Sequence, residues 1–201
     1  TDKGEFFADL VIDAAGMDSP LRKSLPSFLS VEREEGEFSR FYVYRAFYNK
    51  ASDEPAKDPY KVYMLPQGKL GIGWVASEEN FTDVLIGRFA PLSQEEINSS
   101  LETMQKENPR LGTEVKRGGQ LVSIPVRQPL SVLVADGYAA IGDSAFMTVP
   151  IIGSGIANSF KAARILADAV IADKNCAFDT ASLWKYQTDF YKKLGGGLAG
   201  L

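Results

Sequence analysis

Apolar and polar residues alternate through the middle of the chain, which predicts β-strands there. The segment FSRFYVYRAFYN, residues 38 to 49, carries apolar or aromatic side chains at both sets of alternate positions, so it predicts a long strand with two usable faces. Three shorter runs follow, YKVYML, LGIGWVA and DVLIGRF, each bounded by Pro, Gly or Asn. The intervening PQGKLG is typical of a hairpin connection. Together these runs predict an antiparallel meander.

A helical period replaces the alternation in three places. In LSQEEINSSLETMQKENP, Ser93 and Glu96 form a capping-box pair, and the apolar residues that follow share one face. A long helix is predicted near the end of the chain, packed against a sheet, because apolar residues recur there at helical spacing. These residues are Ile156, Phe160, Ala163, Ala167 and Val170. A final helix is predicted from Asp179 to Leu194, with Leu183, Trp184, Phe190 and Tyr191 as its apolar surface.

Two further segments predict strands that lead into turns. The apolar run Leu10 to Ile12 suits a buried strand, Gly16 allows a turn, and Ser19 is placed to cap a helical turn that begins at Pro20. In SVLVADGYAAIGDSA, two apolar runs flank an Asp-Gly pair, which predicts a hairpin. The whole pattern predicts an α+β fold in three blocks, residues 1–37, 38–135 and 136–201, of which the middle block is mostly strand.

Composition removes several function classes. The formal net charge is −4, so no basic surface for nucleic acid is indicated. The chain has no histidine and a single cysteine, Cys176, which excludes an internal disulfide, a Ser-His-Asp triad and a histidine-ligated metal site. We expect no metal. Neither a signal peptide nor an apolar run of the roughly 20 residues that span a bilayer is visible, so we expect a cytoplasmic protein, with peripheral membrane contact left open.

The strongest chemical signal lies around Asp143. A short acidic residue after a buried strand can accept hydrogen bonds from sugar or polyol hydroxyls, and the glycines Gly153 and Gly155 let the start of a helix approach a ligand. The partial positive charge at that helix start favours an anionic group. The alternative is purely structural: the glycines make a tight turn, and Asp143 caps it.

Two motifs in order resemble one superfamily. The segment AAIGDSAFMTVPIIGSGIANSFKAARILAD resembles the Gly-Asp motif of flavoprotein monooxygenases and geranylgeranyl reductases, and LVIDAAGMDSPLR resembles the second fingerprint of the same families. In addition, VYMLPQGKLGIGWV is similar to a pattern in the substrate domain of geranylgeranyl-reductase-like proteins. The resemblance implies a partial FAD-binding α/β domain, residues 1–37 and 136–201, around a mostly antiparallel substrate domain.

The resemblance implies roles for particular residues. Asp143 would contact the ribityl or pyrophosphate region of FAD, Gly16 would allow a turn near the pyrophosphate, and Ser19 and Arg22 would hold that turn. The remaining residues implied at the cofactor are Gly142, Pro150, Gly153, Ser154, Gly155 and Ile156. The aromatic residues implied at the substrate cavity are Tyr42, Tyr44, Tyr63 and Trp74. No catalytic acid or base is identified.

The chain also departs from the family pattern. Ala15 stands where the family usually has Asp, and Phe146 stands where aromatic-ring hydroxylases often have His, which favours the reductase branch. The Gly-x-Gly-x-x-Gly unit that binds the ADP half of FAD is not found, and the first residue is Thr1. We therefore expect a C-terminal portion of a longer enzyme, inactive by itself, which needs an N-terminal FAD-binding segment and leaves sheet edges through which two chains could pair.

The expected whole protein is an FAD-dependent, geranylgeranyl-reductase-like enzyme that reduces a small apolar, isoprenoid-like substrate. A flavin-dependent hydroxylase is the first alternative. The second alternative is a non-catalytic module that binds a ligand or a partner.

Overall fold

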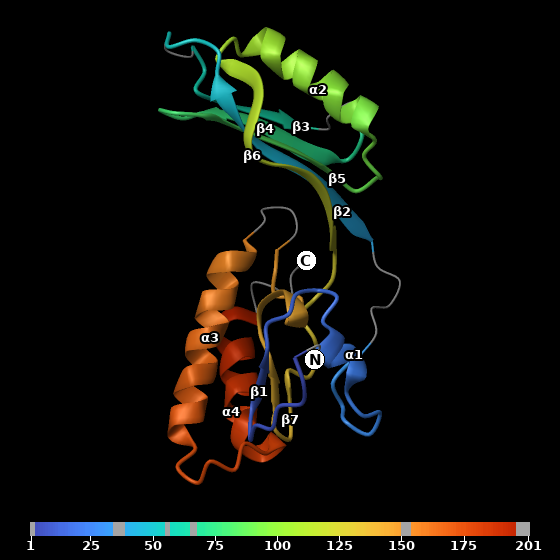
Figure 1. Ribbon diagram of the computed structural model, residues 1–201, viewed down its shortest axis with the longest axis vertical. Helices are drawn as coiled ribbons and strands as arrows, with labels where there is room; N and C mark the ends of the chain where they lie inside the picture. Colours follow the sequence, from blue (N-terminus) through green and yellow to red (C-terminus); the bar gives the residue numbers. More distant parts are fainter. Residues whose placement is uncertain (1–2, 34–38, 55–56, 65–67, 150–153, 196–201) are drawn as a thin grey trace. The chain divides into compact units, whose positions relative to one another are not determined.

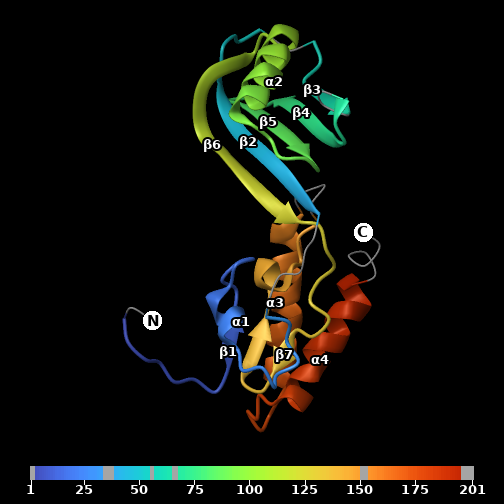
Figure 2. The ribbon, with the colours of Figure 1, turned by 90° about the vertical axis from the view of Figure 1, so that its right-hand side faces the viewer.

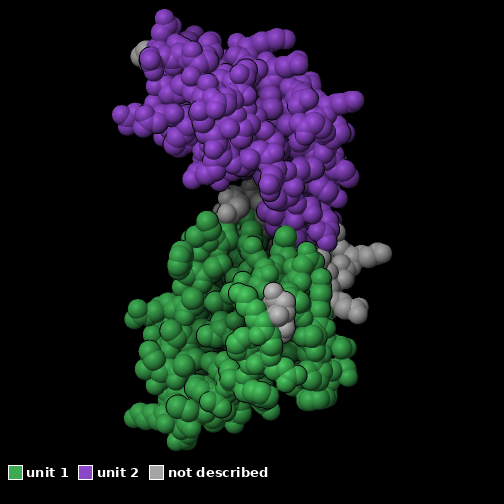
Figure 3. All heavy atoms as spheres, in the orientation of Figure 1, with its two compact units in different colours: residues 1–38, 126–201 green, residues 39–125 purple. Residues whose placement is uncertain are grey.

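The chain forms two compact units. The computed structural model describes residues 3–33, 39–54, 57–64, 68–149 and 154–195. Unit 1 comprises residues 1–38 and 126–201, and unit 2 comprises residues 39–125 (Figure 3). The predicted boundary after residue 135 is misplaced, because it would separate two strands that pair with each other in unit 1.

Unit 1 contains a three-stranded sheet of order β1-β8-β7. Its strands are β1 (Val11–Asp13), β7 (Val134–Ala135) and β8 (Tyr138–Ala140). β7 and β8 form the hairpin predicted around Asp136 and Gly137, and β8 also pairs in parallel with β1, with Val11 opposite Tyr138. The parallel pairing joins segments more than 120 residues apart in sequence, which is the long-range contact that defines this unit.

Unit 1 also contains helices and helical turns (Figures 1 and 2). They are α1 (Pro20–Ser24), the 3-10 turn η2 (Gly142–Ala145), α3 (Gly155–Ala172), α4 (Thr180–Phe190) and the π-helical turn η3 (Tyr191–Gly195). Ser19 caps α1, as predicted, and Asp179 caps α4, since each side chain accepts a hydrogen bond from a first-turn N–H. The buried aromatic rings of Tyr186 and Phe190 pack in the core of the unit, and the Tyr186 hydroxyl donates to the Ala140 carbonyl at 2.8 Å.

The predicted packing face of α3 is wrong. The buried face consists of Asn158, Ala162, Ile165, Leu166 and Ala169. Ile156 and Phe160, which were expected to pack on the sheet, are 76% and 75% exposed. The helix is apolar on two sides, and helical spacing alone does not distinguish the side that the core of this unit covers. Trp184 of α4, also expected on an apolar packing surface, is 44% exposed, whereas Leu183 and Phe190 are buried.

The strand predicted at Leu10 to Ile12 forms as β1, but it is not buried. Val11 and Ile12 are 39% and 49% exposed, and the buried residue of the strand is Asp13. The reason is topological, because β1 is the last strand of the sheet and has a paired neighbour on one side only in the described part of the chain. The apolar residues Val11 and Ile12 therefore lie on a sheet edge that the described part of the chain leaves uncovered.

Unit 2 is a five-stranded antiparallel sheet of order β3-β4-β5-β2-β6, which confirms the predicted meander. Its strands are β2 (Arg40–Lys50), β3 (Tyr60–Met64), β4 (Gly71–Ser77), β5 (Thr82–Arg88) and β6 (Leu111–Pro125). The helix α2 (Gln94–Glu107) packs on one face of the sheet, where Ile97 and Met104 meet Tyr44, Val75 and Ile86. With helices and strands that occupy separate layers, the chain has the predicted α+β fold.

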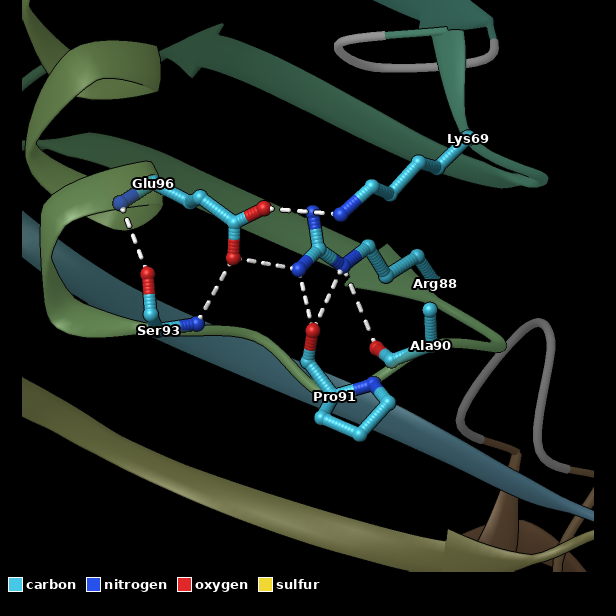
Figure 4. A network of polar contacts seen from close by, with 6 residues as sticks. All are labelled: Lys69, Arg88, Ala90, Pro91, Ser93 and Glu96. Atoms are coloured by element: carbon cyan, nitrogen blue, oxygen red, sulfur yellow. Dashed lines mark hydrogen bonds and ion pairs between the residues drawn. The ribbon is translucent and has the colours of Figure 1, made fainter.

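The start of α2 is fixed to the end of β5 by the network in Figure 4. Ser93 and Glu96 form the predicted capping box, with both reciprocal hydrogen bonds present. The Glu96 carboxylate also accepts from Lys69 at 2.9 Å and from the buried guanidinium of Arg88. Arg88 in turn donates to the carbonyls of Ala90 and Pro91. These contacts hold the pKa of Glu96 well below its usual range, with the hydrogen bond from Arg88 as the largest cause.

Candidate functional site

The two sequence motifs meet at the buried carboxylate of Asp13. Its Oδ2 atom accepts hydrogen bonds from Ser19 Oγ at 2.5 Å and from the Tyr138 hydroxyl at 2.7 Å, and Oδ1 accepts from the Ala15 amide at 3.0 Å. Ser144 Oγ donates to the Asp13 backbone carbonyl at 2.6 Å. A buried carboxylate needs such partners to offset its desolvation. Asp13 therefore holds the turn of the segment LVIDAAGMDSPLR against the strand and turn of the Gly-Asp motif.

Arg22 makes a second link between the motifs. Its side chain is fully buried, and its guanidinium donates to the carbonyls of Met17, at 2.6 Å, and Ser144. Ser19 is also fully buried, and its Oγ accepts from the Arg22 amide at 3.1 Å. Both residues were predicted at the cofactor as supports of the turn at Gly16. The burial of both side chains restricts them to that supporting role, because neither has surface with which to touch a ligand.

The aromatic ring of Phe146 lies between two arginines. The guanidinium of Arg22 is 4.4 Å from the ring centroid, and that of Arg127 is 4.2 Å from it. Arg127 also forms a two-pronged ion pair with Glu32, at 2.8 and 2.7 Å, which lowers the pKa of the Glu32 carboxyl. The backbone of Phe146 is left-handed, with φ of 55°. Phe146 is thus a buried residue whose ring packs between two guanidinium groups.

Asp143 is exposed on η2 and faces the first turn of α3. Its Oδ1 atom accepts a hydrogen bond from the Thr148 hydroxyl. A Cβ atom added to Gly155 would lie 2.3 Å from Thr148 Oγ1 and 3.4 Å from Asp143 Oδ1. With Thr148 in this position only glycine fits, so the backbone at the start of α3 lies beside the hydroxyl and the carboxylate. Sequence analysis missed Thr148, because a threonine five residues after an aspartate belongs to no periodic pattern.

Other predicted cofactor residues lie close to this point. Gly142, immediately before Asp143, has φ of +65°, and a Cβ there would be 2.8 Å from Ser159 Oγ of α3, so the turn and the helix require a glycine. Ser154 precedes α3, but its side chain makes no capping hydrogen bond, and Ile156 is exposed in the first turn. Gly16 has φ of +88° and lies in the turn of the segment LVIDAAGMDSPLR. Pro150 and Gly153 lie outside the described residues.

The predicted substrate residues do not share one surface. Tyr44 is buried under α2, where its hydroxyl is 2.6 Å from that of Tyr48, and Tyr42 and Tyr63 pack against the same core. Tyr63 also donates to Glu107 at 2.7 Å. Trp74 stands on the opposite face of the sheet, since it pairs with Leu85 and lies next to Arg45. Of the four residues, only Trp74 is therefore on the face that α2 leaves uncovered.

The described residues form neither a metal-binding cluster nor a membrane-spanning helix. Within the described ranges, no group of three or more Asp, Glu, Cys or His side chains is arranged to hold a metal ion. In the same ranges, no helix is both long enough and apolar enough to cross a bilayer.

Comparisons with curated proteins agree with the sequence motifs. The chain is 22% identical over 97% of its length to a digeranylgeranylglycerophospholipid reductase from Sulfolobus acidocaldarius, and it covers 44% of that protein. It is 26% identical over 96% of its length to a protein of the same name from Methanothrix thermoacetophila, and it covers 48% of it. The chain thus spans about half the length of the curated relatives that it matches. No protein-family model matches it.

Solved structures show the same fold. A geranylgeranyl bacteriochlorophyll reductase-like protein from Thermoplasma acidophilum aligns with a TM-score of 0.68 and 20% identity, over 94% of this chain and 47% of that one. A probable FAD-dependent monooxygenase from Pseudomonas aeruginosa aligns with a TM-score of 0.59 and 20% identity, over 96% and 54%. The resemblance to the geranylgeranyl reductase and flavoprotein monooxygenase superfamily is confirmed, and the chain has the fold of part of such proteins.

Proposed function

We propose that this chain is the flavin-facing and substrate-binding part of an FAD-dependent oxidoreductase that reduces an apolar, isoprenoid-like substrate. The observation that carries the proposal is the arrangement of Asp143, Thr148 and Gly155 at the start of α3. An exposed carboxylate, a hydroxyl and a bare helix start are the groups that a polyol chain with an anionic end requires. The two curated relatives are named as reductases, which supports reduction.

The residues present fit FAD. The place that a Cβ atom of residue 155 would take is already filled by Thr148 Oγ1, so a ligand at the start of α3 would meet the Thr148 hydroxyl and the Asp143 carboxylate. No side chain of the described residues caps α3, which leaves its first amides available to a ligand. Asp143 can accept a hydrogen bond from a ribityl hydroxyl, while the helix dipole favours negative charge on the ring or phosphates. When bound, FAD supplies the hydride or electron transfer, and the protein orients the cofactor.

The substrate is assigned to the face of the unit 2 sheet that α2 does not cover. Trp74 and Leu85 stand side by side there, and Val62 and Tyr60 extend the apolar surface onto β3, where they are 42% and 58% exposed. A flat apolar face suits an isoprenoid chain, since burial of each CH₂ contributes about 0.8 kcal/mol. A lipid substrate is also compatible with a cytoplasmic protein that touches a membrane peripherally, and that location is part of the proposal.

A further segment of the same polypeptide completes the cofactor site in this proposal. Val11 and Ile12 are exposed on the free edge of β1, and beside them is an apolar groove of about 240 Å³. The groove is lined by Ile12, Ile141, Ala163, Leu166, Ala167, Val170 and Ile171. A neighbouring parallel strand and its helix have the shape to cover this edge and groove, and the curated relatives contain about twice as much chain. The alternative is that a second copy of the chain covers the same edge of β1.

The test is flavin affinity in the full-length protein that contains this chain. Asp143→Ala should weaken FAD binding on the order of tenfold, because it removes a charged acceptor. Asp168→Ala is the matched control, since it removes an exposed carboxylate of α3 that forms an ion pair with Arg164. Fluorescence titration of apoprotein with FAD measures both. Equal affinities in wild type and Asp143→Ala would remove the main support.

Product analysis separates the two reaction classes. With reduced flavin and an isoprenoid substrate, a reductase yields the saturated product without oxygen. The alternative, a flavin-dependent hydroxylase, consumes oxygen and adds one oxygen atom to the substrate. The similarity in fold to the probable FAD-dependent monooxygenase from Pseudomonas aeruginosa supports this alternative.

A further inference from the structure

The backbone of Phe146 adopts a conformation that an aromatic residue rarely takes. Its φ and ψ are 55° and 42°, in the left-handed region, and it ends the η2 turn that carries Asp143. The Phe146 amide donates to the Asp143 carbonyl at 3.1 Å, and the Met147 amide donates to the Gly142 carbonyl at 3.1 Å. A bulky residue keeps such a backbone conformation only where its surroundings stabilise it. The shape of the turn therefore depends on what holds Phe146.

Two arginines from different segments of the chain hold the Phe146 ring. The fully buried Arg22 lies 4.4 Å from the ring centroid, and it also donates to the Ser144 carbonyl within η2. The Arg127 guanidinium lies 4.2 Å from the same centroid. Only 9% of the Arg127 side chain is exposed, so water weakens the attraction between this cation and the ring very little. The ring is thus fixed by two charged groups as well as by apolar packing.

Arg127 is itself held in place. Its Nη1 and Nη2 atoms donate to the two carboxylate oxygens of Glu32, at 2.8 and 2.7 Å, and such a two-pronged ion pair fixes the plane of the guanidinium. Three residues further along the chain, the Leu130 amide donates to the Ala145 carbonyl of η2 at 3.1 Å. Glu32 precedes unit 2 in sequence and Arg127 follows it, so the ion pair joins the two segments of unit 1 that lead into and out of unit 2.

The residues assigned to the cofactor flank Phe146 in the same turn. Asp143 precedes Phe146 by three residues and Thr148 follows it by two, and the Thr148 hydroxyl donates to Asp143 Oδ1. A shift of the Phe146 ring would therefore move both groups relative to the first turn of α3.

We propose that Arg127 is a positioning residue of the proposed FAD site, which holds the Phe146 ring and thereby keeps the Asp143 carboxylate at the start of α3. Glu32 orients Arg127 for this role. The inference deepens the proposed function, because it names the residues that preorganise the site before the cofactor binds, and it rests on that function for the identity of the ligand.

Two measurements on the full-length protein test this role, namely fluorescence titration with FAD and hydrogen exchange of the apoprotein. Arg127→Gln removes the cation beside the ring and should weaken FAD binding on the order of tenfold. In the apoprotein of the same variant, the amides of Phe146 and Met147 should exchange about tenfold faster, because the turn opens more often. Arg164→Gln, which removes an exposed guanidinium of α3, is the matched control and should change neither quantity.

A double-mutant cycle separates positioning from a general loss of stability. In an Asp143→Ala background, Arg127→Gln should lower FAD affinity by less than about twofold, because the carboxylate that it positions is already absent. A general loss of stability would lower the affinity by the same factor in both backgrounds. Unchanged FAD affinity in Arg127→Gln overturns the inference, and so does an equal loss in the two backgrounds.

Two milder variants guard against misfolding. Glu32→Gln changes a side chain that is 36% exposed, removes the ion pair and should weaken FAD binding in the same direction, by about threefold. Arg127→Lys keeps a cation beside the ring and should recover part of the affinity that Arg127→Gln loses. Full FAD affinity in Glu32→Gln would show that the ion pair does not orient Arg127 for this role.

The positioning role and the proposed function fail separately. If wild type and Arg127→Gln bind FAD equally well, only the positioning role is removed. If wild type does not bind FAD, the proposed function is removed, and the exchange rates of the Phe146 and Met147 amides then decide on the turn. Faster exchange in Arg127→Gln retains the role of Arg127 in holding η2, whereas unchanged exchange overturns it.

Discussion

The hydroxyl of Tyr138 donates a hydrogen bond to Asp13 Oδ2 at 2.7 Å and thereby joins two motifs that are 125 residues apart in sequence. Tyr138 is opposite Val11 in the parallel β1–β8 pair, so its side chain reaches along the strand to the carboxylate. Burial, followed by the hydrogen bond to Asp13, raises the pKa of Tyr138 far above its usual value. The tyrosine thus remains a neutral donor throughout the physiological range.

Tyr138→Phe should lower the free energy of unfolding by about 1–3 kcal/mol, because it leaves a buried carboxylate oxygen with one donor fewer. Urea denaturation of the full-length protein measures the change. Tyr60→Phe, which removes an exposed hydroxyl, is the control and should be close to neutral. If the two variants are equally stable, the Asp13 cluster does not hold the motifs together.

Gly155→Ala should weaken FAD binding on the order of tenfold, because the new methyl group overlaps Thr148 Oγ1 and displaces it from Asp143. Fluorescence titration with FAD measures the loss. The double variant Thr148→Ala/Gly155→Ala removes the overlapping oxygen and should recover part of the affinity. Additive losses in the double variant would contradict this explanation.

Phe160→Ala should destabilise the full-length protein by about 2–4 kcal/mol, since we propose that a further segment covers this exposed face of α3. Thermal or urea denaturation is the measurement. Lys161→Ala, at the next and also exposed position of the same helix, should change stability by less than about 0.5 kcal/mol. A Phe160→Ala variant as stable as the control would mean that this face is exposed in the whole protein as well.

Glu96→Gln should destabilise the protein at neutral pH but not in acid. The pKa of Glu96 is lower in the folded state than in the unfolded chain, mainly because Arg88 donates to the carboxylate. Its contribution is therefore present above the unfolded value of about 4.3 and is lost as the pH falls towards the folded pKa. Urea denaturation at pH 7 and at successively lower pH measures the difference between wild type and variant. A difference that stays constant with pH would exclude this ion pair as its cause.

Much of the fold was predictable because it depends on local patterns. Alternation identified β2 to β5, and the Ser93 and Glu96 pair identified the start of α2. The cap at Ser19 and the hairpin at Asp136 and Gly137 also follow from short-range chemistry. β6 was not singled out, since its run KRGGQ breaks the alternation with the glycine bulge.

The candidate site was predictable only in part. The motifs pointed to Asp143 and Gly155, which the structure brings together, whereas Thr148 and Tyr138 entered through contacts that no sequence spacing predicts. The resemblance implied a cavity role for Tyr42, Tyr44 and Tyr63, and the alternation could not correct it, because alternation gives two faces to a strand without saying which one a helix covers.

The sequence by itself determined the strands β2 to β5, the start of α2, the cap at Ser19 and the resemblance to flavin-dependent reductases, since each depends on neighbours within a few residues. The tertiary structure decided which faces are buried, because β1 turned out to be an edge strand and α3 to be apolar on two sides. It also decided the contacts between Asp13 and Tyr138 and between Phe47 and Arg117. These contacts depend on strand register, which forms only when distant segments pair.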